Sequence, residues 1–160
     1  MTYSILISIS EQTLTLYQNN ALVKKYAVST AFNGVGSQKN SGQTPLGNHL
    51  IRAKIGTDQP LNTVFVGRRP TGETYHPNLA KQFPERDWIL TRILWLSGTQ
   101  VGHNRLGQVD TMQRYIYIHG TPDSEPMGIA LSHGCIRMRN QDLIELYDLV
   151  EPYTPIEIVE

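Results

Sequence analysis

The stretch Ser132-His133-Gly134-Cys135-Ile136-Arg137-Met138 contains the only cysteine of the 160-residue chain. One histidine stands two positions before the thiol, and a second, His119, stands before Gly120 at the end of the alternating run Arg114-Tyr115-Ile116-Tyr117-Ile118. A thiol, an imidazole and a nearby cation are the groups from which an activated thiolate can be built. The stretch therefore indicates acyl transfer through a cysteine nucleophile.

The residues on either side of the thiol predict two strands. Residues 114–119 alternate, so a strand there directs Tyr115, Tyr117 and His119 to one face and the isoleucines between them to the core. A second strand over residues 135–139 places Cys135, Arg137 and Arg139 on one face. Arg137 is then about 7 Å from the thiol along the strand. A cation at that distance would favour the thiolate or attract a substrate carboxylate.

The base that takes the proton of the thiol is open between two candidates. His119 ends the first predicted strand, and His133 lies beside Cys135, so either imidazole has the required chemistry. Gly134 has no side chain, which allows a sharp turn and close approach of a carbonyl group. The amide N–H groups of residues 134 and 135 are therefore candidate oxyanion donors.

The same residues could also have structural or metal-binding roles. A lone cysteine can be a small buried hydrophobic residue, and the tyrosines at 115 and 117 can serve packing alone. His119, His133 and Cys135 could bind zinc, but they need a fourth ligand and their spacing is unusual for zinc. The remaining histidines and the pair Arg68-Arg69 are expected in solvated loops; these histidines are His49, His76 and His103.

Composition limits the class of protein. Lysine plus arginine and aspartate plus glutamate number 14 each, and this balance gives no support to nucleic-acid binding. The length suits a single domain over residues 1–160, with no repeat or linker. The first residues lack a basic segment and a long apolar run, so they predict neither a signal peptide nor a membrane span. We expect a cytoplasmic protein, or a periplasmic one if a signal sequence has been removed.

The first part of the chain reads as a β-meander. Residues 3–9, 12–17 and 22–29 are predicted strands, and Asn19-Asn20 suits a tight turn between two of them. Residues 33–48 read as a loop that contains Thr44-Pro45-Leu46-Gly47. Residues 67–87 hold three prolines and read as a long excursion with one helical turn near Leu79.

The second part of the chain predicts further strands and one clear helix. Residues 87–96 are nearly continuously apolar and favour a buried strand, although a helix is possible. Residues 97–113 read as a loop. Residues 141–150 form a predicted helix with Asn140 as N-cap, and its apolar face comprises Leu143, Leu146, Tyr147 and Val150. Residues 155–159 can add a last strand. The expected fold is mainly β with one or two short helices.

His119-Gly120 followed by Ser132-His133-Gly134-Cys135 resembles the active-site signature of the L,D-transpeptidase catalytic domain, the YkuD-like family. Thr44-Pro45-Leu46-Gly47 resembles the other recurrent motif of that family, and the resemblance covers nearly the whole chain. It implies a β-sandwich-like fold with the site in a groove. It also implies that Cys135 is the nucleophile, that His119 is the base, and that the carbonyl of Gly120 orients His119. The residues implied to form the oxyanion hole and line the site are Ser132, His133 and Gly134.

The family acts on peptidoglycan stem peptides, and no cofactor or metal is implied. Because the chain is expected in the cytosol, our hypothesis is an L,D-carboxypeptidase that removes the terminal D-Ala from tetrapeptide stems of soluble muropeptides in recycling. The alternative is an L,D-transpeptidase of the cell wall; a non-catalytic muropeptide-binding protein is a third reading. We expect a monomer with no nucleic-acid or membrane partner. The predicted substrate-binding residues are Arg137, Arg139, Arg92 and Tyr117, and the segment 67–113 is the candidate lid or substrate wall.

Overall fold

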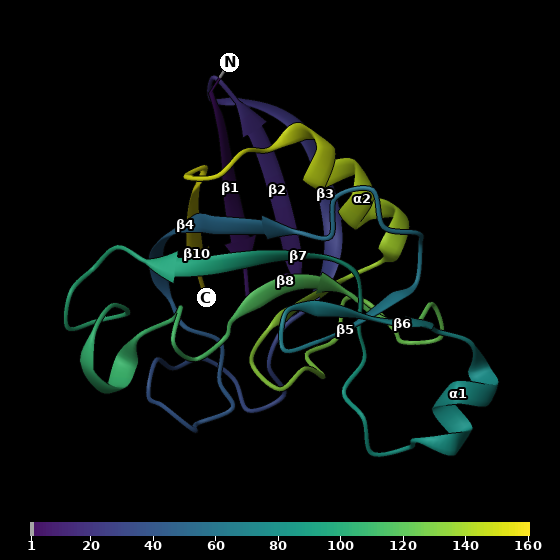
Figure 1. Ribbon diagram of the computed structural model, residues 1–160. Helices are drawn as coiled ribbons and strands as arrows, with labels where there is room; N and C mark the ends of the chain where they lie inside the picture. The colour runs from purple at the N-terminus through teal and green to yellow at the C-terminus, as the bar shows by residue number, and fades with distance from the viewer. Residues whose placement is uncertain (1) are drawn as a thin grey trace.

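The computed structural model describes residues 2–160, which form a strongly bent ten-stranded sheet with two short α-helices (Figure 1). The elements are β1 (Tyr3–Ser8), β2 (Thr13–Gln18), β3 (Ala21–Ser29), β4 (Gly47–Ile55), β5 (Thr63–Val66), β6 (Arg69–Thr74), α1 (Pro77–Gln82), β7 (Ile89–Gly98), the 3₁₀ turn Gly107–Val109, β8 (Tyr117–Gly120), β9 (Ile136–Met138), α2 (Asn140–Leu149) and β10 (Pro155–Val159).

The strands are arranged in the order β4-β10-β1-β2-β3-β9-β8-β7-β5-β6, and β4 also pairs with β7. This additional pairing closes the sheet into a ring from which only the β5–β6 hairpin extends. The strands β1, β2, β3 and β10 lie along roughly the same axis, with β2 antiparallel to β1 and β3, and β4, β7 and β8 cross in front of them (Figure 1). The result is the mainly β, sandwich-like arrangement that the sequence predicts.

The core lies between the crossed layers of the sheet. It is built from one face of each strand: Ile5 and Ile7 of β1, Leu14 and Leu16 of β2, and Ile118 and Ile136 beside the thiol are all at most 3% exposed. Alternation along the strands thus directs these apolar side chains inward. The β-meander, the strand near residues 87–96, the helical turn at Leu79 and the last strand are confirmed by β1–β3, β7, α1 and β10.

The helix α2 covers the core with the predicted residues, since Leu143, Leu146, Tyr147 and Val150 are at most 2% exposed. The prediction that Asn140 is its N-cap is wrong, because Arg139 holds that position and makes no side-chain capping bond. The buried Asn140 side chain instead donates to the carbonyl of Thr121 at 2.9 Å and accepts a hydrogen bond from Thr91 at 2.7 Å. Asn140 therefore ties the helix to β7 and to the end of β8.

Two other local predictions need correction. The strand expected over residues 114–119 begins only at Tyr117, because Tyr115 has a positive φ of 57° and belongs to a turn. The excursion expected over residues 67–87 contains β6, which pairs with β5. Pro70 interrupts the strand pattern of β6 in the sequence, and the structure accommodates this proline because β6 is the outermost strand of the sheet.

His49 was expected on the surface but lies in β4 and is 2% exposed. Its Nδ1 contacts the carbonyl oxygen of Gly47 at 3.0 Å, and its Nε2 contacts the hydroxyl of Thr111 at 2.9 Å. Burial lowers the pKa of His49 to about 4. His49 therefore stays neutral in the folded protein at pH values where the same histidine in the unfolded chain, with a pKa near 6.5, is already protonated.

This difference predicts acid sensitivity of the fold. The unfolded state binds more protons than the native state between about pH 6.5 and 4, so stability falls as pH falls through this window, by roughly 3 kcal/mol for His49 alone. Urea unfolding of the wild type and of His49→Gln across that range measures the effect. The variant is expected to show a shallower dependence of unfolding free energy on pH. Equal slopes for the two proteins would contradict the assignment.

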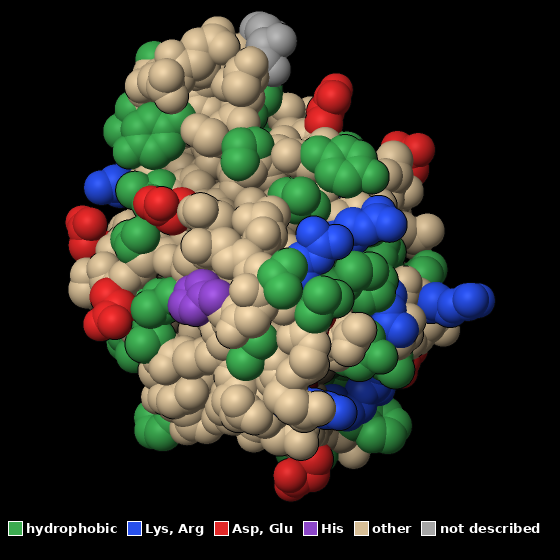
Figure 2. Space-filling model, turned by 90° about the vertical axis from the view of Figure 1, so that its left-hand side faces the viewer, with side chains coloured by type: hydrophobic (Ala, Val, Ile, Leu, Met, Phe, Trp, Pro, Cys, Tyr) green, Lys and Arg blue, Asp and Glu red, His purple; other side chains and the backbone are tan. Residues whose placement is uncertain are grey.

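Charges are balanced in number but uneven in place. On the face in Figure 2, basic side chains gather beside hydrophobic ones, and acidic side chains lie toward the rim. No helix within residues 2–160 has the length and apolar character needed to cross a membrane.

Candidate active site

The neighbouring parallel strands β8 and β9 bring the histidine, the thiol and Arg137 together. Their register pairs Ile118 with Ile136 and His119 with Arg137. The two isoleucines enter the core, and the side chains that alternate with them line a cleft on the other face of the strands. Cys135, one residue before β9, lies in this cleft with His119 and Arg137.

His119 is held in one orientation and one tautomer. It is 1% exposed, and its Nδ1 lies 2.6 Å from the carbonyl oxygen of Gly120. A carbonyl can only accept a hydrogen bond, so Nδ1 carries the proton and Nε2 is the acceptor nitrogen. Burial lowers the pKa of His119, while the charge of Asp87 and the Gly120 bond oppose this effect. The resting imidazole is therefore neutral and able to accept a proton at neutral pH.

Cys135 is also neutral at rest. Its Sγ accepts a hydrogen bond from the Tyr117 N–H at 3.3 Å, and the thiol donates to the Tyr115 carbonyl at 3.4 Å. Removal of water from around the sulfur raises the pKa of Cys135 to about 12, although the Tyr117 N–H opposes this shift. The resting pair is thus thiol and neutral imidazole, and the proton must leave the sulfur during attack.

The turn before the thiol is fixed by side chains from distant segments. Gly134 has a φ of +133°, a region that favours glycine. Its carbonyl accepts a hydrogen bond from the buried Thr44 hydroxyl at 2.9 Å, and its N–H donates to Ser132 Oγ at 3.2 Å. Ser132 Oγ also donates to the carbonyl of Cys135. The two motifs singled out in the sequence therefore meet directly, through Thr44 and Gly134.

Close packing around position 120 requires a glycine there, in addition to the role of its carbonyl in holding His119. A Cβ at this position would overlap Asn140 Oδ1 and lie 2.5 Å from the carbonyl oxygen of Leu90. The end of β8 therefore approaches β7 and α2 so closely that no side chain fits. This contact fixes the carbonyl that holds His119.

Asp87 is a charged residue of the cleft that no sequence motif indicates. Its carboxylate lies 3.2 Å from a guanidinium nitrogen of Arg137 and 3.3 Å from His133 Nδ1. Burial alone would raise the pKa of Asp87, but the charges of His119 and Arg137 and the bond with His133 hold it below its usual range. An ionised carboxylate therefore lies between the exposed His133 and the buried His119.

The predicted substrate-binding residues separate in the structure. Arg137 and Tyr117 line the cleft, and Arg137 is bonded to Asp87. Arg92 does not line it: the Arg92 guanidinium is turned away and donates to the carbonyls of Gln59 and Thr91. Arg139 is exposed at the start of α2, and it too is absent from the cleft lining among residues 2–160. The shared face predicted for residues 135, 137 and 139 thus extends only to Arg137, because the strand ends at Met138.

Two further arginines complete the cleft and were also missed. Arg114 is held by the carbonyl oxygens of Gly36 and Gln43. Arg68, expected to be solvated, reaches back to the hydroxyl of Tyr117 at 3.0 Å. The cleft has a volume of about 390 Å³ and is lined by three arginines, Arg68, Arg114 and Arg137, against a single acidic residue, Asp87. It is suited to an anionic ligand.

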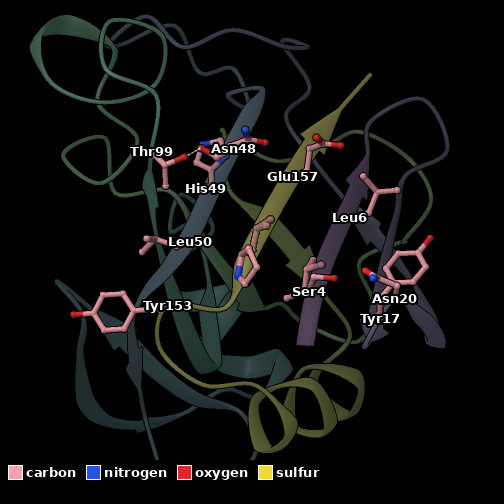
Figure 3. Close-up of a pocket in the computed structure, with 13 residues that line it drawn as sticks. Ser4, Leu6, Tyr17, Asn20, Asn48, His49, Leu50, Thr99, Tyr153 and Glu157 are labelled. Carbon is pink, nitrogen blue, oxygen red and sulfur yellow. Dashed lines mark hydrogen bonds between the residues drawn. The ribbon is translucent and has the colours of Figure 1, made fainter. Parts of the chain in front are cut away.

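A second hollow of about 670 Å³ lies over β1, β4 and β10 and shares no lining residue with this cleft. Figure 3 shows polar and aromatic side chains spread around it, with Tyr153 on one side and Tyr17 and Asn20 on the other. Within residues 2–160, no group of three or more histidine, cysteine, aspartate or glutamate side chains is placed to hold a metal ion.

A buried imidazole in a fixed tautomer and a thiol thus line the same cleft on this closed sheet, and such an arrangement is typical of a cysteine acyl-transfer site. The sequence profile of the L,D-transpeptidase catalytic domain family, YkuD, matches residues 2–158. The chain belongs to this family.

Relatives agree with this assignment. The chain is 28% identical to the YkuD protein of Bacillus licheniformis over 156 residues, which cover 98% of the chain and 65% of that protein. It is also 28% identical to the YbiS protein of Escherichia coli K12 over 111 residues, covering 67% of the chain and 35% of that protein. The chain thus spans less than two thirds of the length of these curated relatives.

Solved structures share the fold. L,D-transpeptidase 3 of Mycobacterium tuberculosis, in complex with a faropenem-derived adduct, matches with a TM-score of 0.60 at 17% identity, covering 99% of this chain and 60% of that one. A cysteine-to-serine mutant of the Enterococcus faecium L,D-transpeptidase matches with a TM-score of 0.58 at 15% identity, covering 99% and 50%. At these identities the likeness concerns the fold.

Proposed function

We propose that the protein is an L,D-carboxypeptidase that removes the terminal D-Ala from tetrapeptide stems of soluble muropeptides through a thioester on Cys135. The observation that carries the chemistry is the His119–Gly120 hydrogen bond, which leaves Nε2 as a proton acceptor in the cleft that contains the thiol. The proposal also rests on membership of a family whose substrates are peptidoglycan stems.

The proposed reaction starts from the neutral thiol of Cys135 and the neutral imidazole of His119. As Sγ attacks the carbonyl carbon before the D-Ala, the thiol proton passes to His119 Nε2 and an oxyanion forms. The C–N bond then breaks, the imidazolium protonates the leaving amine, and a thioester remains on Cys135. Water gives a proton to His119 and attacks the thioester, and that proton returns to the sulfur as the tripeptide leaves. Of the two amides expected as oxyanion donors, the N–H of Cys135 is the proposed donor, because the Gly134 N–H donates to Ser132 Oγ and the two side-chain bonds of Ser132 hold the turn.

The cationic lining supports water over an amine as acyl acceptor. The terminal carboxylate of a tetrapeptide is attracted by a cleft with three arginines, whereas an incoming acceptor stem carries an ammonium group that the same arginines repel. Arg137, paired with His119 across the strands, lies on the side where the leaving D-Ala must receive its proton. We therefore assign the terminal carboxylate to Arg137.

The test is a product assay on a defined soluble tetrapeptide, with and without an added acceptor amine. We expect release of one D-Ala and the tripeptide in both cases by mass spectrometry. Exclusive formation of dimers or amine-exchanged products would instead favour the alternative, a cross-linking L,D-transpeptidase. Tight binding without turnover would favour a muropeptide-binding protein.

The proposed place of action is the cytoplasm, where soluble stems are available and cross-linked wall is not. A periplasmic location would suit the transpeptidase alternative. Fractionation of cells that express the natural gene, followed by detection of the protein, distinguishes the two compartments.

Asp87→Asn is expected to slow turnover and to move its pH dependence. The Asp87 carboxylate raises the pKa of His119 against the effect of burial, so its loss disfavours the imidazolium. We expect kcat to fall roughly tenfold because the imidazole becomes a weaker base, and the acidic limb of the kcat profile to move to lower pH. The exposed neighbour Glu85, changed to Gln, is the control. An unchanged profile in Asp87→Asn would contradict this role.

A further inference from the structure

Arg68 occupies a backbone position that local structure does not favour. It is the second residue of the two-residue turn between β5 and β6, where Gly67 and Arg68 have φ values of 56° and 63°. Two positive φ values are typical of the type I′ hairpin turn, which strongly prefers Asn-Gly, Asp-Gly or Gly-Gly. A long side chain at the second position is therefore locally unfavourable. Such departures are concentrated at functional sites.

The side chain of Arg68 is held in a defined orientation. Its guanidinium carbon lies 4.5 Å from the ring centre of Tyr115 and 5.0 Å from that of Trp95, and one terminal nitrogen donates to the Tyr117 hydroxyl. Stacking on aromatic rings fixes the plane of a guanidinium while leaving N–H groups on its edge. The hairpin turn thus presents an oriented cation to the cleft.

The other two arginines of the cleft have stronger partners. Arg137 is paired with Asp87, and Arg114 donates to two backbone carbonyls. Among residues 2–160, no acidic side chain forms an ion pair with Arg68. A guanidinium in this state is prepared for bidentate binding of a carboxylate from the ligand.

The contacts of Arg68 indicate whether it would bind the carboxylate of the leaving D-Ala or one on the acyl group. Its partners Tyr117 and Tyr115 contact the sulfur through their backbone N–H and carbonyl groups. Arg137, in contrast, is paired with His119, which protonates the leaving amine in the proposed reaction. The leaving D-Ala and the acyl group bonded to sulfur occupy opposite sides of the scissile bond. Arg68 is linked to the sulfur side of that bond through Tyr117 and Tyr115, whereas Arg137 is linked to the side of His119.

We propose that Arg68 binds a carboxylate on the side chain of the residue whose carbonyl is transferred to Cys135, that is, the third residue of the stem. This inference rests on the proposed function and adds a specificity that the family assignment does not contain. A stem with a free side-chain carboxylate at that residue is the preferred acyl donor, and a stem with an amide or no acid there is disfavoured.

The experiment compares Arg68→Asn with the wild type on two tetrapeptides that differ only in a carboxylate or a carboxamide on the third side chain. Asparagine suits the positive φ of the turn, so we expect a thermal midpoint at or above that of the wild type. We expect kcat/KM for the acid to fall about 10- to 100-fold, and that for the amide to change less than about threefold. Arg69→Gln, in the same hairpin but outside the cleft lining, is the matched control.

Equal losses on the acid and the amide would overturn the proposal. A loss that instead follows replacement of the terminal carboxylate by an amide would also overturn it, and would assign Arg68 to the leaving group. Calorimetric binding of both peptides to Cys135→Ala, with and without Arg68→Asn, measures the same preference without turnover. If the wild type releases no D-Ala but binds the acid through Arg68, the proposed function fails and this inference stands. Absence of that preference in binding would overturn the inference.

Discussion

Cys135→Ala is expected to eliminate release of D-Ala, with a loss of about 10⁴-fold or more in kcat, because Cys135 is the proposed nucleophile and the only cysteine of the chain. The measurement is tripeptide formation from a defined tetrapeptide by mass spectrometry. The fold is expected to persist, since Cys135 is only partly buried and belongs to the periphery of a small cluster with Phe65, Ile93 and Tyr117.

An unchanged thermal midpoint is the control for this variant. Because the wild-type thiol has a pKa near 12, its alkylation by a neutral reagent is expected to be slow at pH 7 and to accelerate steadily toward alkaline pH. Persistent turnover in Cys135→Ala would refute the assignment of Cys135 as the nucleophile. Rapid alkylation that levels off near neutral pH would instead indicate a stable thiolate at rest.

His119→Gln is the second change with a large expected effect. The proton of a thiol with a raised pKa has to leave during attack, and the buried His119, oriented by Gly120, is its proposed acceptor. Removing a general base of this kind costs about 10²- to 10⁴-fold in kcat. The remaining activity should rise with pH, because hydroxide partly replaces the imidazole.

The matched control is His133→Gln. The side chain of His133 is 74% exposed and contacts Asp87, so its loss should change kcat much less than the loss of His119. A greater loss in His133→Gln than in His119→Gln would reverse the assignment of the base. The two variants thus resolve the alternative that the sequence alone left open.

The sequence could predict the parts of the fold that depend on local pattern. Period-two alternation identified β1 to β3, continuous apolar content identified β7, and the spacing of Leu143, Leu146 and Tyr147 identified α2. The pairing partners are long-range, so the ring closure through β4 and β7 was not predictable. The hairpin of β5 and β6 was missed because its turn carries Gly67-Arg68 rather than a favoured turn pair.

In the site, too, the residues of a local motif could be predicted, whereas those brought in by long-range contacts could not. Cys135 and His119 were found because they belong to a short motif, and β8 and β9 then bring their backbones together. Asp87 and Arg68 come from a segment with no motif, and only the folded chain brings them to the thiol. Arg92 looked suitable by charge alone, but its hydrogen bonds to Gln59 and Thr91 turn it away from the cleft. The sequence feature that could have indicated the turn at Arg68 was the Gly67-Arg68 pair between two short segments with strand-forming residues.

The position of β10 constrains how this chain can be made. The last strand, Pro155–Val159, pairs with β1 on one side and with β4 on the other. During synthesis, β1 and β4 emerge before β10, and each has one open edge until β10 has left the ribosome. Contacts between the two ends of a chain are also slow to form, because they close the longest loop. The ring of strands therefore closes only after β10 has emerged, and loss of β10 leaves two edges exposed to aggregation.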